Sequence, residues 1–144
     1  MDIMIWEPLF RSLSQKKQAQ GEHSLSKDER LWLLLRRHID EVEENSVIGF
    51  YCGDQAFYVH DIIAAWQSLG MEEMANVFER GNALFAGGGF PENDEERDAL
   101  IEAWQDQEYQ KIFRELDEDF EQALPRAEVA LDQVARRILA KTKI

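Results

Sequence analysis

The chain has 144 residues and a formal net charge of −13, and 44% of its residues are hydrophobic. This composition is typical of one folded domain over residues 1–144; it excludes a disordered acidic tail and, by charge repulsion, a direct nucleic-acid partner. No apolar run reaches the ~18 residues of a membrane span, and the single cysteine, Cys52, fits a reducing cytoplasm.

Apolar residues at helical spacing predict helices over most of the chain. Ser26 and Glu29 form a capping box at the start of the second helix, and Asn93 and Glu96 form another near the middle of the chain. Gly70 has the position of a glycine that ends a helix. The predicted helices cover residues 4–19, 26 to about 44, 57–69, 71–85, 93–120 and 125 onward.

Three boundaries between these helices carry specific expectations. Residues 45–53 mix turn formers with apolar side chains, so a turn or hinge is as consistent with the sequence as a strand. The apolar register of the long acidic helix breaks near residues 106–108, which favours two helices there. Pro125 suits the first turn of the last helix. The prediction is therefore an all-α, single-domain bundle of about six to eight helices.

Acidic side chains are concentrated in one segment of the sequence. Residues 72–122 hold 16 carboxylates and only four basic side chains, a net charge of −12. Several of these carboxylates lie near the C-terminal end of a predicted helix, where the helix dipole disfavours anions, and they repel one another at spacings of three and four residues. A functional anionic face is one interpretation, and a solvated surface is the other.

The candidate partner-binding residues form two rows at helical spacing. Carboxylates three or four residues apart on a helix lie ~5 to 6 Å from each other, a spacing that suits the lysines and arginines that a DNA-binding protein directs at successive phosphates. The first row is Glu95, Asp98, Glu102 and Asp106; the second is Glu115, Glu118 and Asp119, with Asp117 and Glu121 beside it.

No catalytic residue, metal ligand or cofactor is predicted. The acidic run lacks the glycine that the calcium loop of an EF-hand requires, and the three histidines do not form a zinc-binding pattern. Cys52 with His60 remains an open nucleophile and base pair, because such partners meet in space rather than in sequence. His38 shares a helix face with leucines and is predicted to be a hydrogen-bonded core histidine.

Three glycines at residues 87–89 invite comparison with a phosphate-binding loop. The segment lacks the lysine and the serine or threonine of that motif, and the following helix opens with Asp94, Glu95 and Glu96, which repel phosphate. Helix termination is the better interpretation. The tryptophans are predicted to be core or interface anchors, with Trp6 and Phe10 of the first helix the candidates for self-association.

A resemblance to a known family rests on residues about 25–121. Its motifs are Leu25-Ser26-Lys27-Asp28-Glu29-Arg30, Asp40-Glu41-Val42, Gly49-Phe50, Leu69-Gly70-Met71-Glu72, Ala83-Leu84-Phe85-Ala86-Gly87-Gly88, Pro91 and Asp94-Glu95-Glu96-Arg97. In this order and spacing they resemble the bacterial family of the nineteen-kilodalton DNA-mimic protein. The chain departs from the family pattern at residues 43–48, where six residues stand before Gly49 in place of an asparagine and paired glycines.

The resemblance implies an all-helical homodimer whose acidic surface imitates DNA phosphates. Its implied partner is a basic DNA-binding protein of the helix-turn-helix repressor type, bound in competition with DNA and without enzymatic activity. From the residues alone, an immunity-type or adaptor protein that covers a cationic toxin or nuclease is the alternative. Both hypotheses expect salt-sensitive association.

Overall fold

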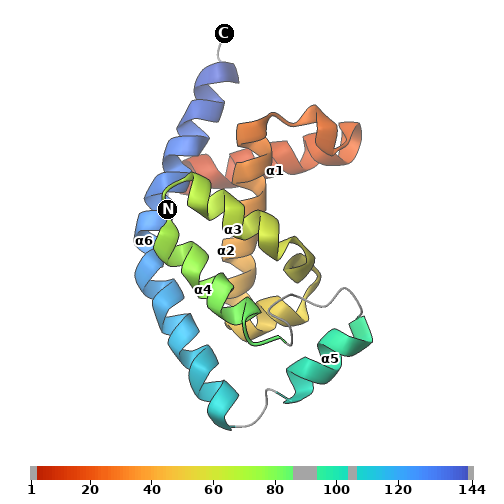
Figure 1. Ribbon diagram of the computed structural model, residues 1–144. Coiled ribbons are helices and arrows are strands. Elements are labelled where there is room, and N and C mark those ends of the chain that lie inside the picture. The colour runs from red at the N-terminus through yellow and green to blue at the C-terminus, as the bar shows by residue number, and fades with distance from the viewer. Residues whose placement is uncertain (1–2, 86–93, 104–106, 143–144) are drawn as a thin grey trace. The chain divides into compact units, whose positions relative to one another are not determined.

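The computed structural model describes residues 3–85, 94–103 and 107–142, and every element in these ranges is helical (Figure 1). The all-α prediction is confirmed. The elements are α1 (Ile3–Gln20), η1 (Glu22–Ser24), α2 (Lys27–Cys52), η2 (Asp54–Tyr58), α3 (Val59–Ser68), α4 (Glu72–Asn82), α5 (Asp94–Ala103) and α6 (Gln107–Thr142).

The described ranges contain six α-helices, α1 to α6, and two short 3₁₀ helices, but two of the predicted boundaries differ from those observed. The segment after Glu44 belongs to α2 as far as Cys52, with a break in the helix at Ser46, and Pro125 lies within α6. In contrast, the predicted change of helix near residues 106–108 agrees with the end of α5 and the start of α6. The glycine run at 87–89 and the Asn93 cap lie outside the described residues.

The chain divides into two compact units, and α2 and α6 contribute to both. Unit 1 comprises residues 1–37 and 125–144, and unit 2 comprises residues 38–124. Each unit has its own buried apolar side chains, and each of the large ones contributes roughly 1.5 to 3 kcal/mol on burial.

Unit 1 has a tryptophan pair at its centre. The rings of Trp6 in α1 and Trp32 in α2 meet edge to face at 5.7 Å, and neither ring is exposed. The Trp6 indole N–H donates to the Asp132 carboxylate of α6 at 2.6 Å, and the Arg36 guanidinium, paired with Glu7, lies over the Trp6 ring. The expectation that Trp6 mediates self-association is therefore wrong, since its ring is core; Phe10 is half-buried.

The predicted capping box at the start of α2 is present. The Ser26 N–H donates to Glu29 Oε1 at 2.8 Å, and the Glu29 N–H donates to Ser26 Oγ at 3.1 Å. Burial by itself would raise the pKa of Glu29, but the hydrogen bonds from Ser26 and the nearby Lys16 ammonium outweigh burial and lower that pKa. The box thus holds an ionised carboxylate at the positive end of the helix.

The core of unit 2 is aromatic. Phe50 and Tyr51 from α2, Phe78 from α4 and Phe120 from α6 are all buried, and α3 and α4 lie side by side over part of this core (Figure 1). The Tyr51 hydroxyl lies 2.9 Å from Asn82 Oδ1 and 3.0 Å from the Phe78 carbonyl oxygen, either of which accepts its proton. Burial raises the pKa of Tyr51 above its usual range.

Within unit 2, α2 is kinked at Ser46. This residue has φ 68° and ψ 176°, a conformation that is essentially restricted to glycine and costs a side-chain-bearing residue about 1 to 3 kcal/mol. The kink lies within residues 45–53, where the sequence left a turn or hinge and a strand open, and the chain is helical again from Val47 to Cys52. Residues 43–48, where the chain departs from the family pattern, therefore contain the kink between the two helical segments of α2.

Replacing Ser46 with glycine is expected to stabilise the fold by about 1 kcal/mol, because glycine adopts this conformation without a steric penalty. Urea unfolding followed by circular dichroism measures the change. Ser46→Ala is the matched control, since it removes the hydroxyl but keeps the strained Cβ, and it should leave stability nearly unchanged. Equal stability of the glycine variant and the wild type would mean that Ser46 is not strained.

Candidate functional site

The two units differ sharply in charge. Unit 2 carries 22 acidic and four basic side chains, a net charge of −18, whereas unit 1 carries seven acidic and 12 basic side chains, a net charge of +5. The two compact units therefore separate acidic from basic side chains more completely than the acidic segment at residues 72–122 does. A unit with this excess of carboxylates produces a negative potential that attracts cations to its surface.

The first half of α6 presents three exposed carboxylates in a row, Glu115, Glu118 and Glu121, which we call the acidic face. They follow one another at intervals of three residues, so their side chains share one side of the helix. No cation in the described ranges forms an ion pair with any of the three. The three carboxylates are therefore exposed to solvent, and the nearest cations along the helix are Lys111 and Arg114, one turn before Glu115 and Glu118.

Asp119 differs from the acidic face because it is used inside unit 2. Its Oδ2 atom lies 2.6 Å from Nη2 of Arg80 in α4, and both side chains are about two-fifths exposed. An exposed pair of this kind contributes roughly 0 to 1 kcal/mol to stability. Asp119 is therefore partly neutralised by its own unit.

Asp117 has a structural partner in the kinked part of α2. Its Oδ1 atom accepts a hydrogen bond at 2.8 Å from the backbone N–H of Val47, the residue after Ser46. This N–H begins a new helical segment beyond the kink and has no partner in its own helix, so Asp117 acts as an N-cap supplied by a different helix. Asp117 fixes the position of α2 against α6 within unit 2.

Asp117→Ala is expected to destabilise the protein by about 1 kcal/mol, the usual cost of losing an N-cap, and more if the buried Val47 N–H stays unpaired. Asp117→Asn keeps an acceptor oxygen in place and should retain most of the stability. Urea titrations of both variants measure this difference. An alanine variant as stable as the wild type would show that the hydrogen bond is not needed.

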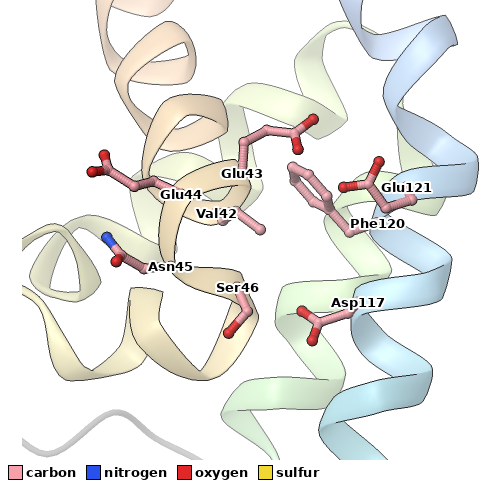
Figure 2. A pocket seen from close by; sticks show the side chains of 8 residues that line it. All are labelled: Val42, Glu43, Glu44, Asn45, Ser46, Asp117, Phe120 and Glu121. Carbon is pink, nitrogen blue, oxygen red and sulfur yellow. The ribbon is translucent and has the colours of Figure 1, made fainter.

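A pocket of about 520 Å³ opens beside this cap, between α2 and α6 within unit 2 (Figure 2). Phe120 and Val42 belong to the lining, although both side chains are buried. The side chains of Glu43 and Glu121 reach toward the space around the Phe120 ring, whereas Glu44 extends away from it (Figure 2). The lining residues are Val42, Glu43, Glu44, Asn45, Ser46, Asp117, Phe120 and Glu121.

The pocket extends the acidic face, because Glu121 belongs to both. Glu43 and Glu44 were not among the candidates drawn from the sequence, since they belong to the segment predicted to end its helix at about Glu44. The carboxylates of this pocket suit the charged end of a long cationic side chain.

The structure describes only part of the first predicted row of partner-binding carboxylates, which begins on α5. Glu95, Asp98 and Glu102 are exposed on this helix, which agrees with the expected spacing along one side. Asp106 lies outside the described residues.

The candidate enzymatic pair gains no support from its surroundings. Cys52, at the end of α2, and His60, in the first turn of α3, are both exposed, whereas activated nucleophile and base pairs usually lie where burial and neighbouring charges perturb them. Within residues 3–85, 94–103 and 107–142, no three histidine, cysteine or carboxylate side chains are grouped as metal ligands. None of the helices described there combines the length and apolar character of a membrane span.

Comparison with protein families decides the relationship. The model of the DMP19-like protein family matches residues 23–139, most of the chain. The chain belongs to the DMP19-like family. The resemblance to the nineteen-kilodalton DNA mimic is thereby confirmed over a longer stretch than residues 25–121.

Searches among curated proteins and among solved structures found no match. Family membership, the charge of unit 2 and the acidic face therefore carry the functional argument. The matched range includes both of the helices that line the pocket, α2 and the first half of α6.

Proposed function

We propose that this member of the DMP19-like family is a non-enzymatic DNA mimic of the cytoplasm. Its partner is a basic DNA-binding protein of the helix-turn-helix repressor type, which it binds through unit 2 in competition with DNA. The observation that carries the proposal is the net charge of −18 on unit 2, with three exposed carboxylates of α6 that form no ion pair with the side chains that the structure describes.

The spacing of the acidic face supports mimicry of a nucleic-acid strand. Three residues of α-helix rise about 4.5 Å, and phosphates along one strand of DNA follow one another at about 3.4 Å along the axis. Glu115, Glu118 and Glu121 therefore offer charges at nearly the density of one strand. Arginine and lysine side chains that normally contact successive phosphates can contact these carboxylates instead.

The pocket adds a feature that a bare row of carboxylates lacks. Phosphates of DNA lie on a convex surface, whereas this pocket is a hollow lined by carboxylates that can receive the charged end of one long cationic side chain. Enclosure removes water from the contact and strengthens the attraction between opposite charges. We propose that one arginine or lysine of the partner enters this pocket while others line up along the acidic face.

Capture followed by competition tests this function. The immobilised protein is exposed at low salt to a lysate of the organism that encodes it, and bound proteins are identified by mass spectrometry after elution with salt. The proposal expects a DNA-binding regulator that duplex DNA displaces from the immobilised protein. Recovery of a nuclease toxin, inhibited on binding, would favour the immunity-type alternative; a captured protein that DNA does not displace would contradict mimicry.

A further inference from the structure

His38 is a buried histidine without a polar partner. Its side chain is completely buried in unit 2, and neither ring nitrogen has a hydrogen-bond partner among the described residues. The sequence-based expectation of a hydrogen-bonded core histidine is therefore half right: the residue is core, but its nitrogens are unsatisfied. A buried polar group in this state costs roughly 1 to 3 kcal/mol, so its presence invites an explanation.

Four aromatic rings surround the imidazole. The ring centroids of Phe78, Phe50, Trp66 and Phe120 lie 4.4, 5.0, 6.2 and 6.3 Å from that of His38. They come from α4, α2, α3 and α6, so every one of these helices within unit 2 places an aromatic side chain against the imidazole. We call these four residues the aromatic cage.

Neither a counter-ion nor a proton acceptor faces His38 within the part of the chain that the structure describes. The one polar atom of the cage is the Trp66 indole N–H, which is a donor and is itself unpartnered. One titratable side chain that borders the cage is Tyr51, whose ring meets Phe50 at 5.2 Å and whose hydroxyl is committed to α4. Glu43 and Glu121 border it at Phe120, since their carboxylates reach toward the space around that ring from the pocket (Figure 2). A protonated His38 inside the closed cage would therefore be an unpaired buried charge.

We propose that His38 is an acid-sensitive lock in the core of unit 2: protonation forces the imidazole out of the aromatic cage, loosens the packing of α2, α3, α4 and α6 in this unit, and releases the bound partner. The release step rests on the proposed function, whereas the loosening does not. Because the acidic face and the cage share α6, through Phe120, loss of this packing disturbs the row of carboxylates directly.

Burial, the sole cause, lowers the pKa of His38 to about 3 in the folded protein, whereas an unfolded histidine titrates near 6.5. The unfolded state therefore takes up the proton first as the pH falls. Stability is full above about pH 6.5 and is lost progressively down to about pH 3. Between pH 7.5 and pH 5, this histidine should raise the unfolding equilibrium constant about 30-fold.

The partner-free test compares urea unfolding at pH 7.5 and pH 5 for the wild type, His38→Leu and His60→Gln. The leucine variant fills a similar volume without a titratable group; His60 is an exposed histidine of the same unit and serves as the control. The expected result is that the about 30-fold pH effect disappears in His38→Leu and persists in His60→Gln. Equal pH dependence in the wild type and His38→Leu would overturn the lock.

A spectroscopic measurement keeps the inference testable if His38→Leu does not fold. In the folded wild type, the imidazole NMR signals of His38 should stay those of the neutral ring from pH 8 to pH 5.5. At lower pH they should change together with the signals of the Trp66 indole, because both rings lie in the cage. A His38 signal that titrates within the intact fold above pH 5.5 would overturn the proposal.

Release is tested with fluorescein-labelled polylysine as the cationic probe. As the pH is lowered from 7.5 toward 3, the wild type should lose the probe at a higher pH than His38→Leu does, since protonation of surface carboxylates affects both proteins equally. Equal loss would overturn the release step. Failure of polylysine to bind at pH 7.5 would overturn the proposed function along with the release step, while the unfolding comparison would still decide whether His38 is a lock.

Discussion

Reversing the charge of the acidic face is expected to weaken partner binding at least about 100-fold, or ~2.7 kcal/mol. The variant Glu115→Lys, Glu118→Lys, Glu121→Lys places three cations where the partner's cations must dock, and like charges in an interface cost several kcal/mol. These side chains are exposed, so the helical circular dichroism should remain unchanged. Fluorescence anisotropy with the captured partner measures the loss.

A matched control separates this face from the overall charge. The variant Asp61→Lys, Glu72→Lys, Glu73→Lys changes the net charge of unit 2 by the same amount, at exposed positions of α3 and α4. It should weaken binding far less and mainly through the long-range potential, which salt screens. If both triple variants lose the same affinity, the partner senses only net charge, and the acidic face has no specific role.

Gly81→Ala is expected to destabilise the protein by about 3 kcal/mol, the largest effect on stability in this account. A Cβ at this position would lie 2.4 Å from the Tyr51 hydroxyl oxygen and 2.6 Å from its ring carbon Cε2, distances at which the ring must move. Movement costs packing strain and also breaks the Tyr51 hydrogen bonds to Asn82 and Phe78. Urea unfolding measures the change.

The Tyr51→Phe variant provides the control for this prediction. By itself it should cost roughly 1 to 2 kcal/mol, because the buried Asn82 carbonyl loses its donor. Combined with Gly81→Ala it removes the nearest colliding atom, so the double variant should be more stable than the sum of the two single effects implies. Strict additivity would show that the Tyr51 hydroxyl and Gly81 do not interact.

Local sequence patterns predicted the parts of the fold that depend on near neighbours in the chain. The Ser26 and Glu29 capping box is present with both hydrogen bonds, and Gly70 has a φ of 74° just past α3. Both features involve residues within a few positions of each other. For the same reason, the apolar spacing identified α1, α3 and α4 closely.

The kink in α2 and the continuity of α6 depend on distant or longer-range features. The conformation of Ser46 is supported by a hydrogen bond from Val47 to Asp117, seventy positions later in the chain. Pro125 looked like a helix start because it lacks an N–H. The buried stripe nevertheless runs through it, since Phe120, Leu124, Ala127 and Leu131 follow one another at intervals of four, three and four residues.

The sequence predicted the acidic character of the candidate site, but it did not show which carboxylates form ion pairs or hydrogen bonds within unit 2. Counting charges found the acidic segment, yet it gave Asp119 and Glu118 equal weight, although only Asp119 has Arg80 beside it. Glu43 and Glu44 joined the site because the kinked α2 lies against α6 within unit 2, at the pocket. Salt bridges and pockets depend on which helices meet, and a single sequence does not determine this.

The most direct test of DNA mimicry is a three-component competition. A fluorescent duplex bound to the captured DNA-binding protein is titrated with the wild-type protein and with the Glu115→Lys, Glu118→Lys, Glu121→Lys variant, and the anisotropy of the duplex reports its release. We expect the wild type to free the duplex stoichiometrically at low salt and less effectively as salt is raised, with no release by the variant. A ternary complex that retains the duplex, or equal release by the variant, would contradict the account.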